Sequence, residues 1–136
     1  MFLTKEYDYG ARIIRALADG TKKTMDQICQ SEYIPGQYAY KILKKLERAA
    51  FLEIIRGRDG GYRLSRPLDT FTFHDIIMAI DDNLFVFECL RGDKGCPFKN
   101  AQRPCTVHKE LERIQRQMIE ELQKKTMSEV LSYVGG

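Results

Sequence analysis

Residues 51–64 carry the pattern that most restricts how this chain can fold. Phe51 to Ile55 is a short apolar run with β-branched residues, which is typical of a strand. Arg56 to Gly61 reads Arg-Gly-Arg-Asp-Gly-Gly, a turn rich in glycine, and Tyr62 to Leu64 returns as a second apolar segment. Two short strands joined by such a turn predict a β-hairpin.

Three helical segments are expected before the hairpin. Apolar residues recur at helical spacing from Tyr7 to Ala18, and Asp19-Gly20 ends that pattern. Thr24 is suited to cap a second helix from Met25 to Ser31. Ile34-Pro35 opens a third segment, with Pro35 expected at the first helical position. Three helices followed by a hairpin form the order of a winged helix-turn-helix.

A fourth helix, an irregular segment and a long final helix are expected after the hairpin. The fourth helix covers Phe73 to Ile80 with Thr72 as its cap, and glycines and prolines break any period from Glu88 to Cys105. An apolar stripe then continues from about Thr106 to Tyr133, formed by Val107, Leu111, Ile114, Met118, Leu122, Val130 and Leu131. A helix this long exceeds what so small a domain can cover. We therefore expect it to pair with its copy in a second chain, the alternative being a helix folded back on its own domain.

The third helix is amphipathic in a way that suits DNA. Its buried stripe is expected to consist of Ala39, Ile42, Leu43 and Leu46. In a winged helix the opposite face enters the major groove, with its N-terminal residues nearest the base edges. We therefore expect base contacts from Gln37, Tyr40 and Lys41. Phosphate contacts are expected from the later cations Lys44, Lys45 and Arg48.

The hairpin tip adds Arg56 and Arg58, with glycines that permit close backbone approach. A wing of this kind places an arginine in the minor groove or against the phosphates. A lysine-rich helix face alone is often only solvated, and such a turn alone is often only a tight hairpin. Their occurrence together and in this order favours binding to double-stranded DNA.

Composition restricts the class of protein further. The 136 residues suit one compact domain, and a net charge of +3 is too mild to indicate nucleic-acid binding by itself. The sequence has no apolar run long enough to span a membrane and no signal peptide, so a cytoplasmic protein is expected. It also lacks a P-loop, a dinucleotide fingerprint and a nucleophile motif, so we do not expect an enzyme.

Three cysteines and one histidine lie close together in the irregular segment. Six residues separate Cys89 from Cys96, eight separate Cys96 from Cys105, and His108 follows one turn into the last helix. Three thiolates and an imidazole form a plausible four-ligand metal site. A structural zinc, a redox-switched disulfide and free thiols remain open alternatives. Cys29 is expected to be a packed core thiol instead.

The sequence resembles the Rrf2 family of bacterial transcription regulators along nearly its whole length. The resemblance rests on Ile34 to Tyr38, on Ile42 to Leu46, and above all on Arg56 to Leu64 with its Gly-Gly-Tyr-x-Leu wing. It implies a homodimer, with the final helices crossing between subunits, bound to a pseudo-palindromic operator. One departure is Ala50, where the family usually has glycine before the strand.

The same resemblance implies an iron–sulfur cluster, of two-iron or four-iron type, on the three-cysteine segment. His108 matches the fourth ligand of the family's regulator of cluster assembly. Asp8 matches the acidic residue that its nitric-oxide sensor supplies from the partner subunit. The expected protein is a repressor that senses iron–sulfur status, nitric oxide or redox state. The alternative is a cluster-free repressor controlled by thiol oxidation, zinc, or a protein or small-molecule partner.

The expected architecture is therefore mostly α with a small β-hairpin wing, a winged helix-turn-helix followed by a long C-terminal dimerisation helix. The boundaries are 1–83 for the DNA-binding domain, 84–105 for the cysteine-containing sensor loop and 106–136 for the dimerisation helix.

Overall fold

The structure is a computed structural model that describes residues 5–81, 88–91 and 105–132. Its elements in chain order are α1 (Lys5–Ala16), α2 (Met25–Glu32), α3 (Gly36–Arg48), β1 (Leu52–Ile55), β2 (Gly61–Leu64), η1 (Leu68–Thr70), α4 (Phe73–Ile80), η2 (Glu88–Arg91), α6 (Thr106–Lys124) and α7 (Met127–Leu131). The predicted fold class is confirmed, because a mostly helical chain carries one antiparallel two-stranded hairpin. None of the helices in these ranges is long and apolar enough to cross a membrane.

The first helices form because their caps and apolar stripes agree with the fold. Thr24 caps α2 in a capping box with Gln27, as its position before the apolar pattern predicts. Tyr33 ends α2 in the left-handed conformation, at φ 56°, which turns the chain towards α3. Pro35 is the N-cap of α3, one position earlier than predicted. Each boundary differs from the sequence prediction by only one or two residues, which is the usual uncertainty at helix ends.

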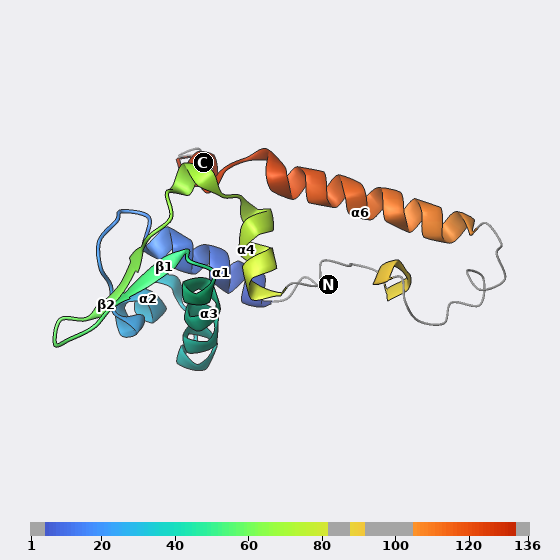
Figure 1. The fold of residues 1–136 in the computed structure, drawn as a ribbon. Helices are drawn as coiled ribbons and strands as arrows, with labels where there is room; N and C mark the ends of the chain where they lie inside the picture. Colours follow the sequence, from blue (N-terminus) through green and yellow to red (C-terminus); the bar gives the residue numbers. More distant parts are fainter. Residues whose placement is uncertain (1–4, 82–87, 92–104, 133–136) are drawn as a thin grey trace.

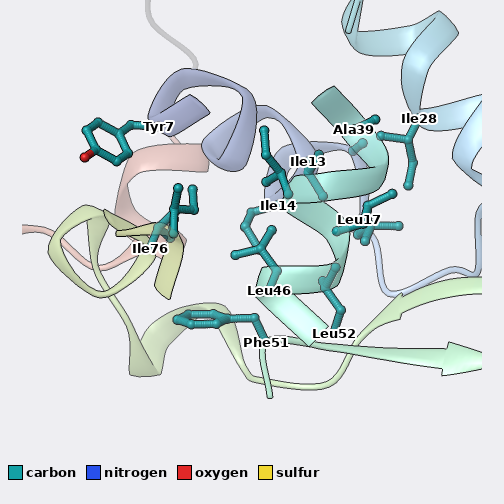
Figure 2. Close-up of a cluster of buried hydrophobic side chains, with 14 of the residues drawn as sticks. Tyr7, Ile13, Ile14, Leu17, Ile28, Ala39, Leu46, Phe51, Leu52 and Ile76 are labelled. Atoms are coloured by element: carbon teal, nitrogen blue, oxygen red, sulfur yellow. The ribbon is translucent and has the colours of Figure 1, made fainter. Parts of the chain in front are cut away.

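The core lies where α1, α3 and α4 meet, with the start of the hairpin closing one side (Figure 2). The predicted stripe of α3 is wholly buried, since Ala39, Ile42, Leu43 and Leu46 are each 0% exposed. Phe51 and Phe71 pack edge to face, with ring centroids 4.8 Å apart. Burial of this stripe fixes which face of α3 remains outside.

An ion pair and a buried hydroxyl connect α1 to its neighbours. Arg15 on α1 pairs with Glu32 at the end of α2, at 2.5 Å. The hydroxyl of Tyr7 donates to an Asp81 carboxylate oxygen at 3.0 Å, just beyond α4. Burial, assisted by Asp81, raises the pKa of Tyr7 to about 12.

Thr21 and Lys23 fix the turn after α1 through Asp19. The Asp19 carboxylate accepts hydrogen bonds from the Thr21 backbone and hydroxyl, at 2.9 and 2.8 Å, and pairs with Lys23 at 3.0 Å. These contacts, the backbone hydrogen bond foremost, lower the pKa of Asp19 to about 2. Lys23 also forms a β-bridge to Tyr62, so this turn supports the second strand of the hairpin.

The hairpin pairs β1 with β2 in the register Leu52↔Leu64 to Ile55↔Gly61. Gly61 lies so close to the turn after α1 that a Cβ there would be 2.7 Å from the Lys23 carbonyl oxygen. Only glycine fits this approach, which explains one of the two adjacent glycines in the turn.

The prediction of one continuous helix from about Thr106 to Tyr133 is wrong. The helix α6 ends at Lys124, Lys125 adopts an extended conformation, and α7 begins after Thr126. The Met127 amide donates to the Phe71 carbonyl at 2.8 Å, and the Met127 side chain is 1% exposed. Burial of Met127 in the winged-helix core therefore outweighs continuation of the helix. Val130 and Leu131 consequently lie on α7 and not on the apolar stripe of α6.

Candidate functional site

The outward face of α3 is the main feature of the candidate site. Gln37, Tyr40 and Lys44 are exposed, with Tyr40 57% exposed despite its large ring. The Lys44 ammonium lies 5.9 Å from the centre of the Tyr40 ring, a cation–π arrangement that pre-orders both side chains. Arg48 is exposed one turn further along the same helix. None of the described carboxylates forms an ion pair with Lys44 or Arg48.

Two other predicted DNA contacts are already paired within the chain. The Lys41 ammonium lies 3.3 Å from one carboxylate oxygen of Glu6, and the Lys45 ammonium lies 3.7 Å from the other. Lys45 also donates to the Ile80 carbonyl at the end of α4, at 3.0 Å. Sequence reasoning missed Glu6, because no local pattern reveals that the first turn of α1 lies beside α3.

The hairpin tip presents two arginines without carboxylate partners among the described residues. Arg56 and Arg58 are both exposed. The tight turn between them requires Gly57, which has a φ of 113° that favours glycine. Lys22 donates to the Asp59 carbonyl, which ties the tip to the turn after α1. The turn that carries the two arginines is therefore stabilised by a contact from outside the hairpin.

In Figure 1 the hairpin extends to the left of the winged-helix body, and one end of α3 extends below it. Exposed cations lie on both elements, with Lys44 and Arg48 on α3 and Arg56 and Arg58 at the hairpin tip. A helix face with an adjacent cationic wing fits the major groove and the neighbouring backbone of a DNA duplex. Every predicted DNA contact except the half-buried Lys45 is exposed, while the DNA contacts themselves stay predictions.

The described part of the cysteine segment places two of the three thiols near α6. Cys105 is the N-cap of α6, where its Sγ accepts a hydrogen bond from the His108 amide at 3.4 Å. Cys89 lies in η2, which contacts α6. Both are half-buried free thiols, and Cys96 lies outside the described residues. The His108 Nε2 atom lies 3.7 Å from Glu112, one turn further along α6.

Asp8 lies on α1, far from the N-terminal end of α6 in the same chain (Figure 1). It forms an ion pair with Arg12 at 2.9 Å and lines a cavity of about 440 Å³ between α1, α4 and α7. The described ranges contain no cluster of three or more metal-ligating side chains. Neither Asp8 nor His108 is therefore assigned as a ligand by the geometry of a single chain.

Cys29 has the environment predicted for it. It packs against the core. Burial, and to a smaller extent the negative charge of nearby Asp26, raises the pKa of its thiol. A raised pKa disfavours the reactive thiolate form of Cys29.

The sequence profile of one protein family, described as "Rrf2: Iron-dependent Transcriptional regulator", matches residues 3–133. The chain belongs to the Rrf2 family. It is also similar to Protein aau3 of Rhizobium meliloti, with 30% identity over 134 residues that cover 96% of this chain and 85% of that protein. Membership of the Rrf2 family identifies the chain as a transcriptional regulator.

Solved structures show the same winged-helix fold. The oxidized form of Staphylococcus aureus CymR has a TM-score of 0.77 at 19% identity, with 100% of both chains covered. CymR, the global cysteine regulator of B. subtilis, has a TM-score of 0.75 at 24% identity, with 99% of both chains covered. IscR of T. potens has a TM-score of 0.70 at 19% identity, covering 100% of this chain and 94% of that one. These likenesses confirm the Rrf2 fold, and they do not decide between cluster-bearing and cluster-free regulation.

Proposed function

We propose that this Rrf2 protein acts in the cytoplasm as a DNA-binding repressor that works by binding and not by catalysis. The observation that carries the proposal is the exposed face of α3, followed in the chain by the exposed cationic hairpin tip. In the proposed complex, Gln37, Tyr40 and Lys41 at the start of α3 reach base edges in the major groove. Lys44, Lys45 and Arg48 contact phosphates, and Arg56 and Arg58 contact the minor groove or its edges.

The first experiment selects duplexes from a randomised DNA library and measures their affinity by fluorescence anisotropy. We expect a pseudo-palindromic consensus and an affinity that falls steeply with salt. Lys44→Met should weaken binding, whereas Lys125→Met should not, because Lys125 is an exposed lysine between α6 and α7, away from α3. Equal affinity of the two variants, or no salt-dependent binding, would remove the support for the proposal.

We propose that the protein is a homodimer and that residues 106–136 provide its dimerisation element through α6. The helix has 19 residues, about 28 Å in length, and none of them is buried in the single chain. Met118 and Leu122 pack against the core, but Val107 is 65% and Ile114 41% exposed. These exposed apolar residues on the N-terminal half of α6 support pairing with a second copy. Light scattering should give twice the chain mass of 15.8 kDa.

We further propose that an iron–sulfur cluster, two-iron or four-iron, is held by Cys89, Cys96 and Cys105, with His108 or the partner's Asp8 completing the ligands. The donor chemistry fits, because cysteine thiolates are the usual protein ligands of iron–sulfur clusters. Cys105 begins α6, so its segment leads directly into the proposed dimer helix. When bound, the cluster would supply a centre sensitive to oxygen or nitric oxide. Residues 84–105 would then act as the sensor loop, and a change there would alter the relative placement of the two α3 helices.

The test is an ultraviolet–visible spectrum with iron and sulfide assays on protein purified without oxygen. We expect visible absorption and matched iron and sulfide in the wild type, and their loss in the triple variant Cys89→Ser, Cys96→Ser, Cys105→Ser. Cys29→Ser is the matched control and should keep the cluster, since Cys29 packs against the core of the winged-helix part. DNA affinity is then compared with and without the cluster, and equal affinity would refute control by the cluster.

A cluster-free regulator is the second candidate. It is favoured by the observation that Cys29, Cys89 and Cys105 are all free thiols, which can be oxidised. A solved structural neighbour is described as an oxidized form of CymR, and another as a global cysteine regulator. Under this candidate, a colourless protein would change its DNA affinity when its thiols are oxidised, or when zinc or a partner binds. Metal analysis combined with a comparison of reduced and oxidised protein separates the two candidates.

A further inference from the structure

Glu6 is the described carboxylate that forms ion pairs with lysines of α3. It lies in the first turn of α1, and its two oxygens face the Lys41 and Lys45 ammonium groups at 3.3 and 3.7 Å. The two lysines are four residues apart, so they lie on one face of α3, one turn from each other. One negative charge thus offsets two of the positive charges that α3 would offer to a phosphate backbone.

The two lysines differ in how easily they can leave Glu6. Lys41 is 59% exposed, and Glu6 is its described partner. Lys45 is 32% exposed and is also bound to the Ile80 carbonyl, so α4 holds it in place. An approaching phosphate would therefore take Lys41 from Glu6 while Lys45 stays. A half-exposed pair of this kind is weak enough to exchange partners.

We propose that Glu6 is a determinant of DNA affinity, because its carboxylate competes with DNA phosphates for Lys41 and reserves Lys45 for the junction with α4. This inference rests on the proposed function, in which α3 faces DNA, and it changes two roles proposed there. Lys41 would contact a phosphate and not a base edge, and Lys45 would remain with Glu6 and the Ile80 carbonyl and not contact a phosphate. The consequence is that the sequence-independent part of DNA binding is weakened, since that part depends on how many lysines and arginines can neutralise phosphates. Base-edge contacts from Gln37 and Tyr40 would be left unchanged, so Glu6 would raise discrimination between operator and other DNA.

The test uses a random-sequence duplex of about 30 base pairs, because the proposed competition does not depend on sequence. The proposal expects Glu6→Gln to bind it about threefold to tenfold more tightly at about 50 mM salt. The slope of log affinity against log salt should steepen by up to about one, the value for one further neutralised phosphate. Glu121→Gln is the control, since it makes the same charge change on α6 at an ion pair with Lys124.

A double-mutant cycle tests whether the tighter binding of Glu6→Gln depends on Lys41. Lys41→Met should cost more affinity in the Glu6→Gln background than in the wild type, because Lys41 is then free to bind phosphate. Equal cost in both backgrounds, or unchanged affinity and salt slope in Glu6→Gln, would overturn the inference about Glu6. A wild type that does not bind the duplex at low salt would instead overturn the proposed function itself.

Discussion

Ala50 should be replaceable by glycine with a gain in stability. It has a φ of 64°, in the left-handed region, between the end of α3 and β1. Its amide donates to the Glu47 carbonyl and its carbonyl accepts from the Ser65 hydroxyl, both at 3.0 Å, so this conformation is fixed from both sides. The residue is exposed, so its methyl group contributes little to the core. The left-handed conformation costs a non-glycine residue about 1–2 kcal/mol.

Glycine removes that cost but loses about 0.5–1 kcal/mol through the greater entropy of the unfolded chain. We therefore expect Ala50→Gly to raise the free energy of unfolding by up to about 1.5 kcal/mol, the difference between these two ranges. Urea denaturation at fixed protein concentration, with an unchanged m value, measures it. Ala49→Gly is the control, because Ala49 has a φ of −87° and packs against the core. It should lower stability by about 0.5–1 kcal/mol or more. The same sign for both substitutions would refute the reasoning.

Three further substitutions test the packing and the pH dependence. Met127→Ala should lower the free energy of unfolding by about 2–5 kcal/mol, because Met127 is 1% exposed. The control Met78→Ala, at a residue 38% exposed, should lower it by under about 1 kcal/mol. Similar losses in the two variants would mean that α7 is not part of the core. The raised pKa of Tyr7, about 12 against 10.0, means that the hydroxyl bonded to Asp81 stabilises the fold below pH 10 and that this stability is lost as pH rises through about 12. Tyr7→Phe should therefore flatten the alkaline part of the unfolding profile, and an unchanged alkaline limb would contradict this account. The pKa of Asp19 is lowered, to about 2 from 3.8, so its contribution to stability is present above pH 3.8 and is lost as the pH falls through about 2. Asp19→Ala should therefore lower the Tm clearly at pH 6 and much less near pH 2. Thermal scans at both pH values test this, and equal decreases would contradict it.

Periodicity predicted the winged-helix part because its elements agree with their local signals. The stripe of α3 and the caps Thr24 and Thr72 lie where the sequence pattern placed them. Ala50 departs from the glycine expected before the strand, and its left-handed conformation explains why glycine suits that position. Each of these features depends on residues only a few positions apart, which is the range over which sequence patterns are informative.

Periodicity alone does not predict that the C-terminal helical segment is divided into α6 and α7. Apolar residues continue at helical spacing through residue 131, but the chain is interrupted because Met127 reaches the core beside Phe71. A local signal was present, since Thr126 and Glu129 have the spacing of a capping box and Thr126 does cap α7 at the Glu129 amide. No comparable signal existed for Glu6, whose contact with α3 joins residues 35 positions apart. Such a pair follows from the helix packing and not from the local sequence.

The net charge of +3 conceals an uneven distribution of charge that bears on DNA binding. On α6 three of the cations are matched by neighbouring carboxylates, in the pairs Arg113–Glu110, Arg116–Glu112 and Lys124–Glu121. The cations without a described carboxylate partner include Lys44, Arg48, Arg56 and Arg58, which lie on α3 and the hairpin tip. Screening at physiological salt limits the range of a surface charge to about 8 Å. A DNA phosphate therefore responds to this local excess of positive charge and not to the net charge of the whole chain. A single carboxylate on that side, such as Glu6, therefore changes the field that DNA meets far more than its share of the net charge suggests.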